Sequence, residues 1–307
     1  MVIPNAVYKW IVKQNNNLPI IALITFLFPR FFLRTILNAN QNKNRWNPRK
    51  ACVTLSFDCD YPEDVEAMPQ LSDMLKGFPF KASFAVVGHW VEKYPREHLK
   101  VLDGGHEFLN HTYSHPDNEL LNPGRKFKNV PYDEKRIEVE RCHEICKKVL
   151  GYEPIGLRIP HFKNLFTFEI YSILKEMGYK YSSSTWLTNT LSHGLPFMGP
   201  EGIIEFPLTT CPEHPFTVFD TWHSLNAKRL SHRIKHRGCQ SYLKLFNLLI
   251  KYAKDTNSYI NIYMDPLDIK KIPDFYKMLE VLADDEISVV TYEEYINNKL
   301  FVCSHGY

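Results

Sequence analysis

The stretch "ACVTLSFDCD", Ala51 to Asp60, indicates the fold of this chain. Its first seven residues are apolar or β-branched apart from one serine, which is typical of a buried strand. The run then ends abruptly in two carboxylates, Asp58 and Asp60, with Cys59 between them. Acids are rarely chosen for a core, so this strand end is expected to carry chemistry.

Strand and helix patterns alternate after this first strand. Further strands are expected at residues 81–87, 106–111, 155–160, 179–185, 202–208, 259–264 and 287–291. Helices are expected at residues 62–77, 91–105, 133–151, 167–178, 241–254 and 273–283, with Asp133 as an N-cap and Gly151 after a C-terminus. About seven such repeats predict an α/β fold with a parallel barrel rather than an open sheet.

A polar linker at residues 38–50 divides the chain. We expect an N-terminal apolar and basic segment at 1–48, a catalytic barrel at 49–300 and a short tail at 301–307. The apolar run at 18–28 is shorter than the roughly 20 residues that span a bilayer. Residues 1–37 therefore either contact a membrane surface peripherally or form helices packed on the barrel. No small-residue cleavage site follows the run, so a removed signal peptide is not expected.

Composition narrows the classes of function. The 37 basic and 34 acidic residues are interspersed and give a net charge of +3, which does not predict nucleic-acid binding. Seven cysteines without regular spacing favour reduced thiols and a cytoplasmic protein, membrane-associated if the N-terminal segment binds lipid. Cys142 and Cys146 flank His143 in a pattern of helical period, so we interpret them as core residues.

In parallel folds, the carboxyl ends of all strands meet at one rim, where such proteins place their chemistry. The expected strands end at Asp58 and Asp60, His111, Arg158, Trp186 and Asp265.

The motif "HTYSHP" places His111 and His115 four residues apart, a spacing that on a helical turn brings both imidazoles to one face. With Asp60 they form a set of two nitrogens and one carboxylate, which suits catalytic zinc or non-haem iron. Asp58 is a candidate base for a water activated there, and Arg158 could hold that carboxylate ionised.

Four motifs together carry a family resemblance. The run "GHEFLNHTYSHP", preceded by "SFDCD" and followed by "RIPHF" and "YINIYMDP", resembles the polysaccharide deacetylase family, also called the NodB-homology hydrolases or carbohydrate esterase family four. The resemblance covers about residues 50–295 in the family's order. It implies a distorted (β/α)7-type barrel that holds a divalent metal, usually zinc. It also implies an enzyme that removes acetyl groups from sugars by means of a water molecule activated by that metal.

The resemblance also implies roles by position. Asp58 matches the general base, and Arg158 the arginine of the third motif. A backbone N–H near His161 would hold the oxyanion, and Trp186 would wall the acetyl pocket. The implied metal ligands are Asp60, His111 and His115.

Two positions depart from the family pattern. Cys59 separates two aspartates that are commonly adjacent. The fifth motif, which usually ends in a histidine acid, ends here in Asp265, whose pKa would have to be raised for it to donate a proton. His214 or His223, from the irregular stretch at 187–240, is the alternative donor.

These observations favour an enzyme that removes N-acetyl groups from an amino sugar in a glycan or glycolipid. Two alternatives stay open. One is a hydrolase of a non-sugar amide or ureido bond, and the other is an inactive relative that binds glycan without turnover.

Overall fold

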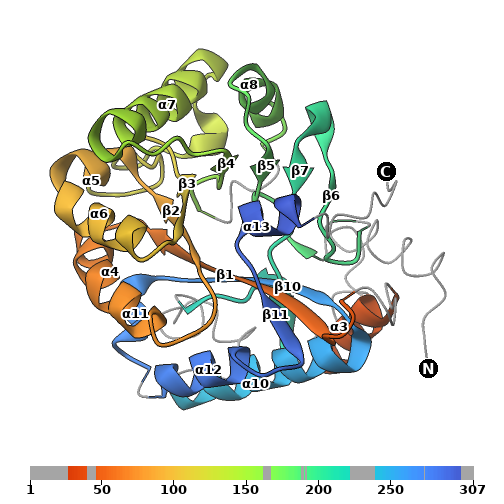
Figure 1. The fold of residues 1–307 in the computed structure, drawn as a ribbon. Coiled ribbons are helices and arrows are strands. Elements are labelled where there is room, and N and C mark those ends of the chain that lie inside the picture. The colour runs from red at the N-terminus through yellow and green to blue at the C-terminus, as the bar shows by residue number, and fades with distance from the viewer. Residues whose placement is uncertain are drawn as a thin grey trace.

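Figure 1 shows the computed structural model, which describes residues 27–39, 46–161, 167–187, 190, 192–221, 239–272 and 274–298. The expected apolar run at 18–28 lies outside these residues except for its last two positions, and so does the tail at 301–307.

Helices and strands alternate along most of the described chain. The helices are α3 (Pro29–Ala39), α4 (Pro62–Leu75), α5 (Gly88–Lys93), α6 (Pro95–Asp103), α7 (Tyr132–Ile145), α8 (Ile170–Glu176), α10 (Cys239–Thr256), α11 (Pro266–Ile269), α12 (Phe275–Leu282) and α13 (Tyr292–Asn297). The strands are β1 (Ala51–Cys59), β2 (Ser83–Val86), β3 (Glu107–Asn110), β4 (Gly156–Leu157), β5 (Tyr181–Ser182), β6 (Phe197–Met198), β7 (Ile204–Glu205), β8 (Thr210–Cys211), β9 (His214–Val218), β10 (Tyr259–Met264) and β11 (Ile287–Val289).

Nine strands form one curled sheet in the order β10-β1-β2-β3-β4-β5-β7-β6, with β11 also paired to β1. Its pairs are parallel except for β6 with β7. Helices surround the outside of the curl (Figure 1). Strand β10, at one end of the sheet, approaches the segment that follows β7, where the Thr209 N–H donates to the Asn261 carbonyl at 2.8 Å. The predicted distorted α/β barrel is therefore confirmed.

Strand β1 explains how one element serves both packing and chemistry. Because side chains alternate along a strand, Leu55, Phe57 and Cys59 face outward into the main hydrophobic core. Ser56 and Asp58 face the barrel interior, where both contact Arg158. Cys59 is thus a core residue that separates Asp58 from Asp60.

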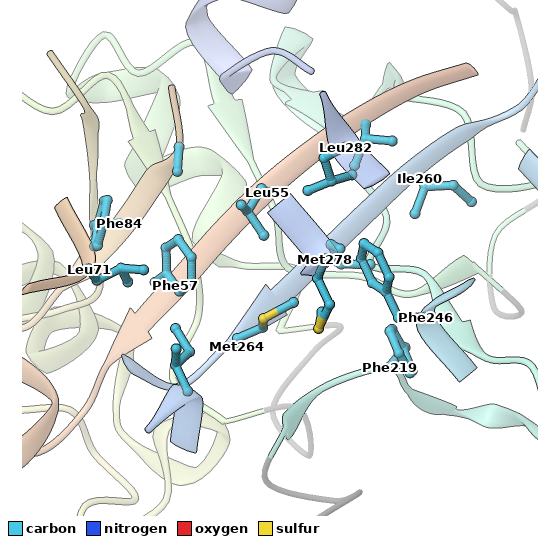
Figure 2. Packing of buried hydrophobic residues seen from close by; sticks show 14 of the residues in the cluster. Leu55, Phe57, Leu71, Phe84, Phe219, Phe246, Ile260, Met264, Met278 and Leu282 are labelled. Atoms are coloured by element: carbon cyan, nitrogen blue, oxygen red, sulfur yellow. The ribbon is translucent and has the colours of Figure 1, made fainter. Parts of the chain in front are cut away.

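The outer core lies between the sheet and its helices. Figure 2 shows Leu55, Phe57, Leu71, Phe84, Phe219, Phe246, Ile260, Met264, Met278 and Leu282 gathered there. A second core fills the barrel and is rich in aromatic rings: Tyr181, Phe206, Tyr259, Tyr292 and Tyr295. Gly156 stands against this inner core because a Cβ there would lie 1.9 Å from the Tyr181 ring.

Several boundaries differ from those predicted. The helix expected at 91–105 is two helices, α5 and α6, because Pro95 cannot donate into a continuous helix. Helix α7 begins at Tyr132, so Asp133 lies in its first turn rather than at the N-cap. Gly151 does adopt the left-handed conformation expected after a helix, with φ of 64°. Strand β7 lies inside the strand predicted at 202–208, whereas β6, β8 and β9 lie in parts of the chain that were expected to be irregular.

Helix α3 shows how the described end of the N-terminal segment packs. Leu33, Ile36 and Leu37 are fully buried in the outer core. Arg34 lies 3.9 Å from Asp255 of α10. Among the described residues, no helix combines the length and apolarity needed to cross a membrane.

Candidate metal centre and active-site cavity

Three side chains converge beyond the carboxyl ends of β1 and β3. Asp60 Oδ1 lies 3.1 Å from His111 Nε2 and 3.3 Å from His115 Nε2. These three atoms are buried and have no hydrogen-bond partner in the structure. Buried polar atoms are normally paired, so their convergence fits a cation that all three would ligate. One carboxylate and two imidazoles are a donor set suited to catalytic zinc.

Local hydrogen bonds orient the first histidine. The His111 ring nitrogen Nδ1 lies 2.8 Å from the backbone carbonyl of Arg158, which can only accept. Nδ1 therefore carries the proton, and Nε2 keeps its lone pair for a metal.

The second histidine is placed by backbone geometry rather than by a helix. Residues between His111 and His115 form a loop, so the predicted helical turn is wrong. Thr112 and His115 have φ of 67° and 49°, in the left-handed region. The Thr112 N–H donates to Asn110 Oδ1 at 2.8 Å, and the His115 N–H donates to Thr112 Oγ1 at 3.1 Å. These contacts stabilise the turn that brings the rings to a centroid distance of 4.9 Å.

Further side chains support the loop. Glu138 of α7 accepts hydrogen bonds from the Ser114 N–H at 2.8 Å and its hydroxyl at 2.6 Å. Trp90 Nε1 and Asn118 Nδ2 donate to the Asp60 carbonyl at 2.9 and 2.6 Å. Burial acts to raise the pKa of Asp60, but the neighbouring imidazoles outweigh it and hold that pKa well below its usual range.

Asp58 forms a buried ion pair next to this group. Its Oδ1 accepts a hydrogen bond from Arg158 Nη1, and the two side chains are only 9% and 1% exposed. Burial raises the pKa of the Asp58 carboxyl, and the Arg158 guanidinium opposes that effect. The ion pair fixes the direction of a carboxylate that lies next to the group formed by Asp60, His111 and His115.

A cavity of about 390 Å³ opens here and is lined by Asp58, Asp60, His115, His161, Tyr263 and Asp265. Asp265 directly follows β10 and lines the same cavity as Asp60 and His115. Its backbone N–H donates to Thr221 Oγ1 at 2.9 Å. Burial, followed by the nearby Asp64 carboxyl, raises the Asp265 pKa well above its ordinary value. A raised pKa makes this carboxyl a better proton donor near neutral pH.

Residues 45–182 match the family model described as polysaccharide deacetylase. This part of the chain is similar to the polysaccharide deacetylase family. A peptidoglycan-N-acetylglucosamine deacetylase from Bacillus cereus is 37% identical over 112 residues, or 36% of this chain and 37% of that relative. The chain thus matches well under half the length of that protein.

Two solved structures share the fold. A Mycobacterium smegmatis protein, provisionally described as a polysaccharide deacetylase, has a TM-score of 0.67 and 17% identity over 84% of this chain and 94% of its own. A pseudoenzyme of carbohydrate esterase family four from Bacillus anthracis has a TM-score of 0.53 and 17% identity, covering 81% and 66% of the two chains.

The remaining predicted site residues of this chain lie in different places. His161 lines the cavity and has a left-handed backbone with φ of 58°. Trp186 is half-buried and packs with Leu208, Val218 and Tyr263. Since Tyr263 lines the cavity, Trp186 lies behind part of its wall. His223 falls outside the described residues, and only the backbone of His214 is described.

Sequence reasoning missed several cavity residues, among them Tyr263 and Asp64. Tyr263 lines the cavity and donates to Asp220 Oδ2 at 2.7 Å. The alternation of β10 could have identified it, because Tyr263 is two residues before Asp265. Asp64 accepts the N–H groups of Tyr61 and Leu267 at 3.1 and 3.0 Å, which links the starts of α4 and α11. Burial and the Asp60 carboxylate raise the Asp64 pKa to about 8.

Proposed function

We propose that this chain hydrolyses the amide bond of an N-acetylated amino sugar in a glycan or glycolipid, with a divalent metal, expected to be zinc, as cofactor. The observation that carries the proposal is the convergence of Asp60, His111 and His115 with unpaired ligand atoms. Asp58, which forms an ion pair with Arg158, lines the same cavity as Asp60 and His115. The similarity of residues 45–182 to the polysaccharide deacetylase family supports the reaction class.

A divalent metal bound at this group would supply Lewis-acid polarisation of the acetyl carbonyl and acidify a water molecule. In our proposal, Asp58 accepts the proton of that water as it attacks the carbonyl carbon. Arg158 holds the Asp58 carboxylate in one direction through its Nη1 contact. The backbone N–H near His161 donates to the developing oxyanion.

Collapse of the tetrahedral intermediate breaks the C–N bond and requires a proton on the leaving amine. We assign its delivery to Asp265, which lines the cavity on the β10 side. The raised pKa of Asp265 supports this role, since a donor must be protonated before the bond breaks.

One observation favours a second candidate function. Asp265 stands where the family usually has a histidine acid, and a pseudoenzyme shares the fold. A metal-containing module that binds glycan without turnover is therefore the alternative. Hydrolysis of a non-sugar amide or ureido bond would use the same residues on another substrate.

The substrate carrier is a further part of the proposal. Helix α3 and the residues before it expose Leu27, Phe28 and Phe31 by 55%, 61% and 49%. The Arg34 side chain is 56% exposed on the same helix. Exposed aromatic and basic side chains suit peripheral contact with an anionic membrane surface, consistent with a lipid-linked glycan on the cytoplasmic side.

The test combines metal loading with acetate release. The purified chain is stripped with a chelator, reloaded with zinc, and assayed on chito-oligosaccharides, peptidoglycan fragments, and ureido and cyclic amide compounds. We expect zinc-dependent acetate release from the N-acetylated sugars and none from Asp58→Asn. Glycan binding without acetate release would support the non-catalytic module instead. Turnover confined to the ureido or cyclic amide compounds would replace the sugar substrate.

A further inference from the structure

The Arg158 guanidinium lies inside the barrel, below the cavity, and is 1% exposed. Its Nη1 contacts Asp58, whereas its Nη2 faces three hydroxyl oxygens. These are Tyr292 Oη at 2.5 Å, Ser56 Oγ at 2.9 Å and Ser183 Oγ at 3.1 Å. Three hydroxyl acceptors at Nη2 therefore orient the guanidinium whose Nη1 contacts Asp58, the expected base.

The number of donors and acceptors on each side chain fixes the direction of each hydrogen bond in this group. A guanidinium can only donate, so Tyr292 Oη accepts from Arg158 and gives its own single proton elsewhere. Asn261 Oδ1 receives that proton at 2.7 Å. The Asn261 amide cannot be flipped, because its Nδ2 donates to the backbone carbonyl of Phe206 at 2.9 Å. The contacts form a one-way relay of hydrogen bonds, in which Arg158 donates to Tyr292 and Tyr292 donates to Asn261.

The two serines are oriented in the same manner. Ser56 Oγ donates to the Ile262 carbonyl at 3.0 Å, and Ser183 Oγ donates to the Phe206 carbonyl at 3.1 Å. Both therefore present lone pairs to Arg158.

Tyr292 itself is held firmly although it comes from the last helix of the described chain. Its side chain is fully buried, and its ring stacks on Tyr181 at 5.1 Å. Its backbone N–H donates to Glu107 Oε2 at 3.0 Å. Tyr292 does not belong to the cavity lining, and its hydroxyl is linked to Asp58 through the Arg158 guanidinium.

We propose that Tyr292 and Asn261 are positioning residues that lock the Arg158 guanidinium toward Asp58. This inference rests on the proposed function, in which Asp58 is the base. Loss of the Tyr292 hydroxyl leaves Nη2 with the two serines alone and lets the guanidinium tilt away from the carboxylate. Small misplacements of such groups reduce the chemical step strongly while leaving substrate binding intact.

The kinetic test compares two tyrosine variants that each remove one buried hydroxyl. Tyr292→Phe keeps the stacked ring but breaks the relay. Tyr181→Phe is the matched control, because its hydroxyl contacts Glu107 at 2.5 Å and not Arg158. We expect kcat to fall about 10- to 100-fold in Tyr292→Phe, with KM and metal content unchanged, and much less in Tyr181→Phe. A kcat for Tyr292→Phe equal to that of Tyr181→Phe would overturn the proposal.

A second readout needs no activity. NMR of the guanidinium nitrogens measures rotation of the Arg158 Nη groups, with the signals assigned by their loss in Arg158→Lys. We expect rotation about tenfold faster in Tyr292→Phe than in the unmodified chain or Tyr181→Phe. Asn261→Leu, which removes the next link, should change it in the same direction.

Equal rotation rates in all variants would refute the relay. If the unmodified chain releases no acetate from any substrate, the proposed function fails, and the NMR comparison alone decides whether Tyr292 positions Arg158.

Discussion

His98 gives a quantitative test of how the outer helices pack on the sheet. It lies on α6, is fully buried, and places its ring edge-on against Phe108 of β3 at a centroid distance of 5.9 Å. Its Nδ1 donates to the Tyr94 carbonyl at 2.7 Å, and its Nε2 has no hydrogen-bond partner in the structure. Burial lowers the pKa of His98 from 6.5 to about 4.

The sign of the effect follows from proton binding. The unfolded chain binds a proton at His98 below its ordinary pKa, whereas the folded chain resists protonation until about pH 4. The contribution is therefore fully present above pH 6.5 and is lost as the pH falls toward 4. A gap of about 2.5 in pKa corresponds to about 3 kcal/mol of unfolding free energy.

Urea unfolding of the chain and of His98→Gln, measured with chelator from about pH 8 to pH 4, tests this value. At pH 8 His98 is neutral in the folded and the unfolded chain, so the difference in unfolding free energy between the unmodified chain and His98→Gln reflects lost contacts alone. That difference serves as an internal control. Below pH 6.5 we expect the unmodified chain to lose up to about 3 kcal/mol more than the variant. A difference that stays constant across the whole range would refute the burial of His98 against β3.

Three further changes test other parts of the account. Asp58→Asn should abolish acetate release and keep the metal, as measured by elemental analysis; metal loss would mean that Asp58 is a ligand. Asp265→Asn should depress kcat about 100-fold or more and remove the basic limb of the pH–rate profile, and an unchanged profile would exclude it as the acid. Gly156→Ala should lower the unfolding free energy, measured by thermal denaturation, by about 3 kcal/mol, because its Cβ would meet the Tyr181 ring. An unfolding free energy within about 1 kcal/mol of that of the unmodified chain would contradict this packing.

The long buried strands were predictable because their hydrophobic runs extend over the whole element. Strands β1 and β10 match the expected ranges closely. Helices α5 and α6 were not separated in advance, because their apolar residues give one continuous helical pattern that Pro95 interrupts. Strands β4 and β5 are only two residues long, and the backbone that follows them holds Arg158 and Ser183 in the polar interior.

The site was predictable where it depends on strand ends and less so where it depends on distant partners. Asp60, His111 and His115 were identified as a group from the ends of their strands, although a loop rather than a helical turn aligns the histidines. Glu138 and Tyr292 were not identified. Their contacts join parts of the chain separated by 24 and 134 residues, which no local pattern records.

The central claim is that Asp60, His111 and His115 hold a divalent metal. Elemental analysis after zinc loading and gel filtration tests it most directly, with His115→Ala as the variant and His98→Gln, which changes a buried histidine away from the site, as the control. We predict about one zinc per chain in the unmodified protein and in His98→Gln, and almost none in His115→Ala. Equal zinc in all three proteins, or none in any, would contradict the assignment.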